Sequence, residues 1–316
     1  MNKRTKKNEI LSIKLIAILF ALSALQVSAK TPYEFSVHAA GGYSFFSHRL
    51  LNNNTFVIGS VENDYNPPPV GLYAVHNVSS SGSAGDLGFG FTGFVTPYVG
   101  LHVGLGINLN NINVKVDSLK TYTRGLIDDN DMEYDLYTNL FHYKEKRQTF
   151  SLSIPFMLQF QTVESVSAWG SRGSDFQHGF YAKAGIKLNI LLSNTYESEV
   201  ATLYNAAYYP EADNWQATQT FAGLGTFKGK SAKGDFGFVQ TMFACEAGMK
   251  WRVASDMFIY TGAYFDYGLN DPAKNNRQQT SNYLFQDDLR DLALLEYTEK
   301  VHLMTVGVKI SLAFIR

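Results

Sequence analysis

The chain has almost no cysteine. Of its 316 residues only Cys245 is a cysteine, so no internal disulfide can form. The 7 histidines are scattered, without an HxxxH-type pair and without a Cys/His cluster at zinc spacing. We therefore expect no metal site and no other cofactor.

An excess of basic charge is also missing. The whole chain has 27 Lys+Arg against 28 Asp+Glu. Without its first 29 residues, which carry five basic residues and one acid, it holds 22 basic and 27 acidic residues. A nucleic-acid partner would require a basic face, so we expect none.

Long hydrophobic runs are confined to the N-terminal end. Lys3, Arg4, Lys6, Lys7 and Lys14 precede an apolar run of eleven residues, 15–25. That run is short of the roughly twenty residues that span a bilayer, which argues against an anchoring helix. The small residues of Val27-Ser28-Ala29 then form a cleavage site. Residues 1–29 are predicted to be a secretory signal peptide cleaved after Ala29, which leaves 30–316 as one domain.

Aromatic residues and glycine are plentiful, with 23 Phe, 19 Tyr and 26 Gly, and they follow a period of two. The first alternating segment sets Tyr33, Phe35 and Val37 against Glu34, Ser36 and His38. In a strand these two sets face opposite sides of the sheet. One face is therefore apolar and the other polar.

Seven further segments repeat this pattern. The eight predicted strands cover about 33–47, 86–95, 99–116, 148–161, 179–192, 235–252, 257–269 and 304–314. The gaps at about 49–85, 117–146, 194–234 and 270–299 are long, and those between them are shorter. We predict an all-β fold, an eight-stranded antiparallel up-and-down transmembrane β-barrel with four long extracellular loops and both mature termini in the periplasm. Pro155 counts against a central strand at its position, and a soluble β-sandwich is the alternative fold.

The polar faces carry charges in mid-strand, among glycines. The predicted polar network of the lumen consists of Lys183, Lys187, Glu246, Lys250, Asp266 and Lys309. If the fifth and sixth predicted strands pair across the third gap, Lys187 and Glu246 lie at similar depth and form an ion pair. An interior of eight strands is just wide enough for side chains to fill, which favours a plug over an ion- or proton-conducting path.

Aromatic residues gather near the strand ends, as in the two girdles of membrane barrels. The short-turn rim is predicted to carry Tyr33, Phe35, Phe160, Phe180, Trp251 and Phe314. The long-loop rim is predicted to carry Phe45, Phe89, Phe150 and Tyr267.

Several segments together resemble a known family. They are SLSIPFMLQF, GFYAKAGIKLNILLS, FACEAGMKWRVASDMFIYTGAYFDYGLND, VHLMTVGVKISLAF and the turn segment TPYVGLHVGLGI. They are similar to the outer-membrane β-barrel domain common in Bacteroidota, a porin-family relative of OmpA-like barrels. The resemblance covers roughly Tyr33 to Phe314, and the peptidoglycan-binding domain of full-length OmpA-type proteins is absent from this sequence. It implies the bacterial outer membrane and its assembly machinery, and no catalytic residues.

The leading functional hypothesis is a non-catalytic structural or surface-binding barrel whose long loops carry the function. Its expected partners are outer-membrane lipid, lipopolysaccharide, the assembly machinery and an unknown extracellular ligand. A small-solute channel is the second hypothesis. A lipid-A-modifying enzyme, with His48, His76, His142 or Asp266 at the rim, and a secretion-associated barrel are further alternatives.

Overall fold

The described part of the protein folds as antiparallel strands. The computed structural model describes residues 32–50, 71–162, 178–219, 223–235, 239–270 and 298–315. The predicted signal peptide and residues 271–297 lie outside these ranges. The strands are β1 (Tyr33–Leu50), β2 (Gly71–Thr96), β3 (Val99–Ile127), β4 (Glu133–Gln161), β5 (His178–Tyr209), β6 (Asn214–Gln216), β7 (Gly225–Asp235), β8 (Val239–Arg252), β9 (Met257–Gly268) and β10 (Thr298–Ile315).

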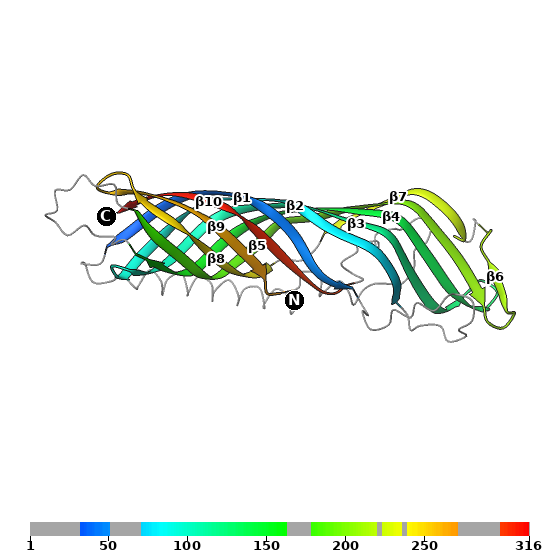
Figure 1. Ribbon diagram of the computed structural model, residues 1–316. Helices are drawn as coiled ribbons and strands as arrows, with labels where there is room; N and C mark the ends of the chain where they lie inside the picture. Colours follow the sequence, from blue (N-terminus) through cyan, green and yellow to red (C-terminus); the bar gives the residue numbers. More distant parts are fainter. Residues whose placement is uncertain are drawn as a thin grey trace.

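Eight of these strands close into a ring. The order is β1-β2-β3-β4-β5-β8-β9-β10, and β10 pairs again with β1. Every pairing is antiparallel, and the first and last strands meet along their length from Glu34–Ile315 to Leu50–Thr298. The predicted eight-stranded ring is confirmed, and the β-sandwich alternative is wrong because one sheet closes on itself through β1 and β10. Figure 1 shows the closed part with β8, β9 and β10 across its front.

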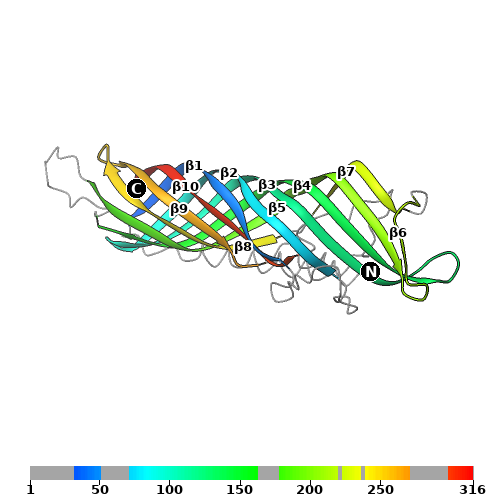
Figure 2. The same cartoon turned by 45° about the vertical axis from the view of Figure 1, so that its right-hand side comes forward.

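Much of what the sequence suggested as long loops is strand. β3 and β4 each have 29 residues and β5 has 32, so the predicted gaps 117–146 and 194–234 are largely sheet. Above the closed ring β7 takes the place of β8 beside β5, from Thr195–Asp235 to Asn205–Gly225. Figures 1 and 2 both show β3, β4, β5 and β7 running on beyond the ring to the end that holds β6. We call the part of these strands beyond the ring the extension.

Within the ring, the polar face of each strand points inward. On β1 the side chains of Glu34, Ser36 and His38 are buried, whereas Phe35 and Val37 are exposed on the outside. The other strands of the ring follow the same rule, so a wall of apolar side chains surrounds a polar interior. This is the reverse of a protein folded around an apolar core in water.

The polarity inverts along the strands. On β3 the inward side chain of Asn110 is followed by the buried Ile112, Val114 and Val116, while Asn113 and other outward positions become polar. The outward apolar positions of β3 run over residues 99–109, a height of about 25 Å for a strand tilted about 40°. Successive side chains still alternate between the two faces at the start of the extension. What changes there is that the inward residues become apolar and the outward residues become polar.

Pro155 lies in β4 in spite of the expectation that it weakens a strand there. It pairs with Lys187 of β5, and the ladder between β3 and β4 skips its position. The ladder is therefore interrupted on the side of β3, where proline has no N–H to donate. Gly104 faces it from β3, where an added Cβ would lie 3.0 Å from the Pro155 Cγ.

Candidate functional site

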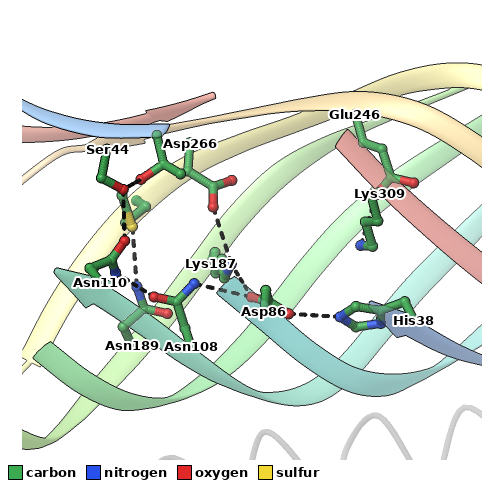
Figure 3. A network of polar contacts seen from close by, with 12 residues as sticks. His38, Ser44, Asp86, Asn108, Asn110, Lys187, Asn189, Glu246, Asp266 and Lys309 are labelled. Atoms are coloured by element: carbon green, nitrogen blue, oxygen red, sulfur yellow. Dashed lines mark hydrogen bonds and ion pairs between the residues drawn. The ribbon is translucent and has the colours of Figure 1, made fainter. Parts of the chain in front are cut away.

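The interior of the ring is filled by a network of charged side chains, which we call the lumen network. At its upper level Asp86 of β2 contacts an imidazole and an ammonium group, since its carboxylate oxygens lie 2.8 Å from His38 Nε2 and 2.7 Å from Lys187 Nζ. Lys187 also donates to Asp266 Oδ2 at 3.1 Å. Figure 3 shows these groups converging from β1, β2, β5 and β9. One ammonium thus joins two carboxylates from opposite walls.

Amide and hydroxyl groups continue this level toward the extension. Asn108 donates to Asp86 Oδ2 at 3.3 Å, and its own Oδ1 accepts from Asn110. Ser44 donates to Asn110 Oδ1 at 2.8 Å and lies 2.9 Å from the Thr305 hydroxyl. Burying a polar group costs free energy unless the group is hydrogen-bonded. Here each of these side chains forms a hydrogen bond with the next one in the series.

The predicted ion pair between Lys187 and Glu246 is wrong. Glu246 accepts instead from Lys309 at 2.9 Å and from the Tyr181 hydroxyl at 2.7 Å. The register of β5 against β8 sets Lys183, not Lys187, opposite Glu246. The expectation assumed a simple hairpin across the third gap, whereas β5 continues through the extension and returns through β7 before β8 begins.

The lower level is centred on Lys250, whose side chain has no exposed surface. Its Nζ donates to Glu34 Oε1 at 2.5 Å and to Gln161 Oε1 at 3.0 Å, and it lies 4.2 Å from the ring centre of Phe258. Tyr260 donates to the other oxygen of Glu34. The Lys250 ammonium group is thus surrounded by a carboxylate, an amide oxygen and aromatic rings, which take the place of water around it.

Lys183 lies between the two levels, without a carboxylate at ion-pair distance among the described residues. Its Nζ is 5.6 Å from the Tyr181 ring centre and 5.1 Å from that of Tyr260. The six side chains expected in the lumen therefore all point inward, but only some bind one another. Their carboxylate partners Glu34 and Asp86 were not among the expected residues. Both lie on the inward parity of their strands, so the polar-face rule could have found them.

A second, apolar layer lies at the end of the lumen next to the extension. Ile112 and Val114 of β3 pack there with Val200 of β5, Met242 of β8 and Leu303 of β10. Below this layer a cavity of about 30 Å³ is lined by Asp86, Lys187, Glu246, Asp266, Lys309 and their neighbours. That volume is large enough for a water molecule and too small for a solute. Within the described part of the chain, ion pairs fill one level of the lumen and packed aliphatic side chains fill another.

The aromatic residues expected on the outside face outward. Phe180 is 67% exposed, and Tyr33, Phe35, Phe89, Phe160 and Phe314 are also exposed, whereas Phe45, Phe150, Trp251 and Tyr267 are half-buried. Phe89 lies lower than expected, because its ring stacks on Phe35 of the short-turn rim at 6.4 Å. Tyr33 and Phe91 meet beside them at 5.5 Å.

The far end of the extension, residues 125–138 and 204–219, is a second candidate site, which we call the distal tip. The turn between β3 and β4 is held by Asp128, whose Oδ1 accepts the backbone N–H groups of Asn130 at 2.9 Å and Met132 at 3.0 Å. The bond from Met132 is the main reason that the pKa of Asp128 is lowered. Tyr209 donates to Asp128 Oδ2 at 3.3 Å, and burial, followed by this carboxylate, raises the pKa of Tyr209.

Comparison with solved structures finds other small barrels. Ail, the attachment invasion locus protein of Yersinia pestis, is 9% identical, with 89% of this chain and 98% of that chain covered and a TM-score of 0.28. Neisserial surface protein A is 8% identical, with 88% and 95% covered and a TM-score of 0.27. The outer membrane protein OprG from Pseudomonas aeruginosa is 12% identical, with 90% and 95% covered and a TM-score of 0.29. These values are too low to carry an inference about function.

No protein-family model matches the chain, and no curated protein is significantly similar to it. In the described ranges no helix has the length and apolar character to cross a membrane.

Of the rim residues considered for catalysis, the two that the structure describes lie apart. Asp266 is buried in the lumen with Lys187, whereas His142 is exposed on the outer face of β4, at a residue with a φ of 54°. The side chains of His48 and His76 lie outside the described part. Within that part, no three His, Cys, Asp or Glu side chains form a group able to hold a metal ion.

Proposed function

We propose that this protein is a non-catalytic barrel of a bacterial outer membrane, whose lumen is closed and whose extension is a surface-binding part. The observation that carries the proposal is the inversion of polarity along single strands. On β3 the outward side is apolar up to Leu109 and polar from Asn111 to Asp117. A strand with this distribution passes from hydrocarbon into water at that point.

The size of the outward apolar surface supports a lipid environment. Leu87 of β2, Phe180 of β5, and Val308 and Ile310 of β10 are each 60–68% exposed on the outside of the ring. Soluble monomers rarely expose a continuous apolar patch above a few hundred Å². Outer-membrane lipid and lipopolysaccharide are the partners we propose for this band, and the assembly machinery would insert it.

The two filled levels of the lumen support a structural or binding role over a channel. Planar-bilayer recordings of the purified protein test this point. We expect no steady current, because Lys187 and Lys250 are each held by carboxylates in the path. A stable open-channel current would favour the small-solute channel instead.

Orientation is tested by cysteine labelling of intact cells. Replacing Cys245 by serine gives a cysteine-free background, in which Asn130→Cys marks the distal tip and Ser255→Cys marks a short turn. A membrane-impermeant maleimide should label the first variant in intact cells and the second only after lysis. The opposite result would place the extension in the periplasm and end the surface-binding proposal.

A further inference from the structure

Three aromatic rings meet on the distal tip. Trp215 of β6 lies between Tyr137 of β4 and Tyr208 of β5, with ring centres 4.8 Å and 4.9 Å away. The planes are tilted by 52° and 40°, so the rings form a shallow cage around the Trp215 face and not a closed stack. Trp215 remains 52% exposed. The indole is thus fixed by two neighbouring rings, and about half of its surface is free to contact a partner.

Two ladders fix this cage. Trp215 pairs with Tyr208 in the β5–β6 ladder, and Tyr137 pairs with Ala206 in the β4–β5 ladder. The Tyr208 hydroxyl donates to Asp213 Oδ1 at 2.8 Å, which sets a carboxylate at the edge of the cage. Beneath it Leu126, Leu136, Ala207 and Leu224 form a small core. The rings are therefore held in place before any partner arrives.

The two segments that make up the distal tip carry charge of one sign. Residues 125–138 and 204–219 contain seven acidic residues and no lysine or arginine. The acids are Asp128, Asp129, Asp131, Glu133, Asp135, Glu211 and Asp213. The two acidic turns lie together, because Tyr209 at the end of β5 binds Asp128 of the β3–β4 turn. Several charges spread over two adjacent turns match a ligand with several cations in a row.

From these two features we propose that the distal tip binds a basic polypeptide segment, with one guanidinium or ammonium group over Trp215 and its neighbours paired with the acidic turns. The proposal deepens the surface-binding role and rests on it. A cation is attracted to the face of a tryptophan within about 6 Å of the ring centre, and tyrosine faces add to this. Charge complementarity over the turns supplies long-range attraction and register.

The test is fluorescence anisotropy of a labelled octa-arginine peptide with the purified full chain in an uncharged detergent. We expect saturable binding at low salt that weakens as salt is added, and none with an octa-glutamate peptide. Trp215→Ala should raise Kd about three- to fivefold, as expected for one exposed cation–π contact. Trp215→Phe should retain most of the affinity, which separates loss of the ring from loss of the fold.

Matched variants separate a site from general charge. Asp129→Asn/Glu133→Gln removes two acids from the tip and should raise Kd about tenfold. Glu197→Gln/Glu199→Gln removes two exposed acids from β5 lower on the extension and should change Kd less than twofold. Phe141→Ala, which removes an exposed ring outside the cage, should have no effect.

The absence of peptide binding overturns the proposal. So does an unchanged affinity in Trp215→Ala, or an equal loss in the Glu197/Glu199 control, because binding would then follow net charge alone. The experiment uses protein in detergent, so its outcome is independent of lumen conductance and of cell-surface orientation. A conducting barrel that still binds at Trp215 would contradict only the closed lumen.

Discussion

Replacing Lys187 by methionine should be among the most damaging single substitutions in the barrel. Its Nζ lies 2.7 Å from Asp86 and 3.1 Å from Asp266, and the two carboxylate side chains are only 7% and 6% exposed. Methionine fills similar space without the charge, so both acids lose their shared partner. Removing one member of a buried ion pair costs about 3–5 kcal/mol. We expect the free energy of unfolding to fall by that amount.

A double-mutant cycle isolates the electrostatic part. Adding Asp266→Asn to Lys187→Met should restore at least about 1 kcal/mol, because the amide no longer needs a cation. Lys187→Met combined with Glu246→Gln is the control. Glu246 is held by Lys309 and Tyr181 instead, so those two losses should add within about 0.5 kcal/mol.

The assay is reversible urea unfolding of the barrel in lipid vesicles, followed by the fluorescence of its 3 tryptophans. Unchanged slopes of the transitions would show that stability alone has moved. A loss below about 1 kcal/mol for Lys187→Met, which is smaller than any broken buried pair should give, would refute the reasoning. Equal coupling of Lys187 to Glu246 and to Asp266 would refute it as well.

Three further predictions use neighbouring positions as their own controls. Ile107→Arg, within the outward apolar band of β3, should destabilise the folded barrel by about 2–4 kcal/mol in vesicles. Asn113→Arg, on the same face but in the extension, should cost less than about 0.5 kcal/mol. Equal costs would show that the membrane boundary does not lie between these two residues. Gly42→Ala should cost about 1–3 kcal/mol in the same assay, since the added Cβ would lie 2.5 Å from the Val306 carbonyl oxygen. Gly41→Ala should be neutral, because a Cβ there would have no atom within 4 Å. A neutral Gly42→Ala would show that β10 can move away. The Asp128 carboxyl should titrate by NMR below its ordinary pKa of 3.8, so its turn gains stability above that pH and loses it as pH falls through the lower folded pKa; a midpoint at or above 3.8 would contradict the two backbone hydrogen bonds.

The closed ring and the facing of its side chains could be predicted because a strand's period is local. From Tyr33 to His38 apolar and polar residues alternate, which assigns each of them to one face, and the period of two carries that assignment along the strand. The extension was missed for a related reason. Beyond Asn110 the period of two continues, but the outward residues are polar. A segment rich in Asn, Asp and Tyr has the composition of a loop. Only the structure shows that its inward residues Ile112, Val114 and Val116 pack together.

What the sequence by itself determined was the alternation, the strand number and the inward position of Lys183, Lys187, Glu246, Lys250, Asp266 and Lys309. Only the tertiary structure decided which of these charges meet. That choice depends on the stagger between strands, and a stagger is fixed by bulges, strand lengths and ring closure over the whole sheet. Glu34 and Lys250 are 216 residues apart, and Trp215 and Tyr137 belong to different ladders. No local pattern encodes such pairs, so the partners in the lumen and the ring cage at the tip appear only once the barrel is closed.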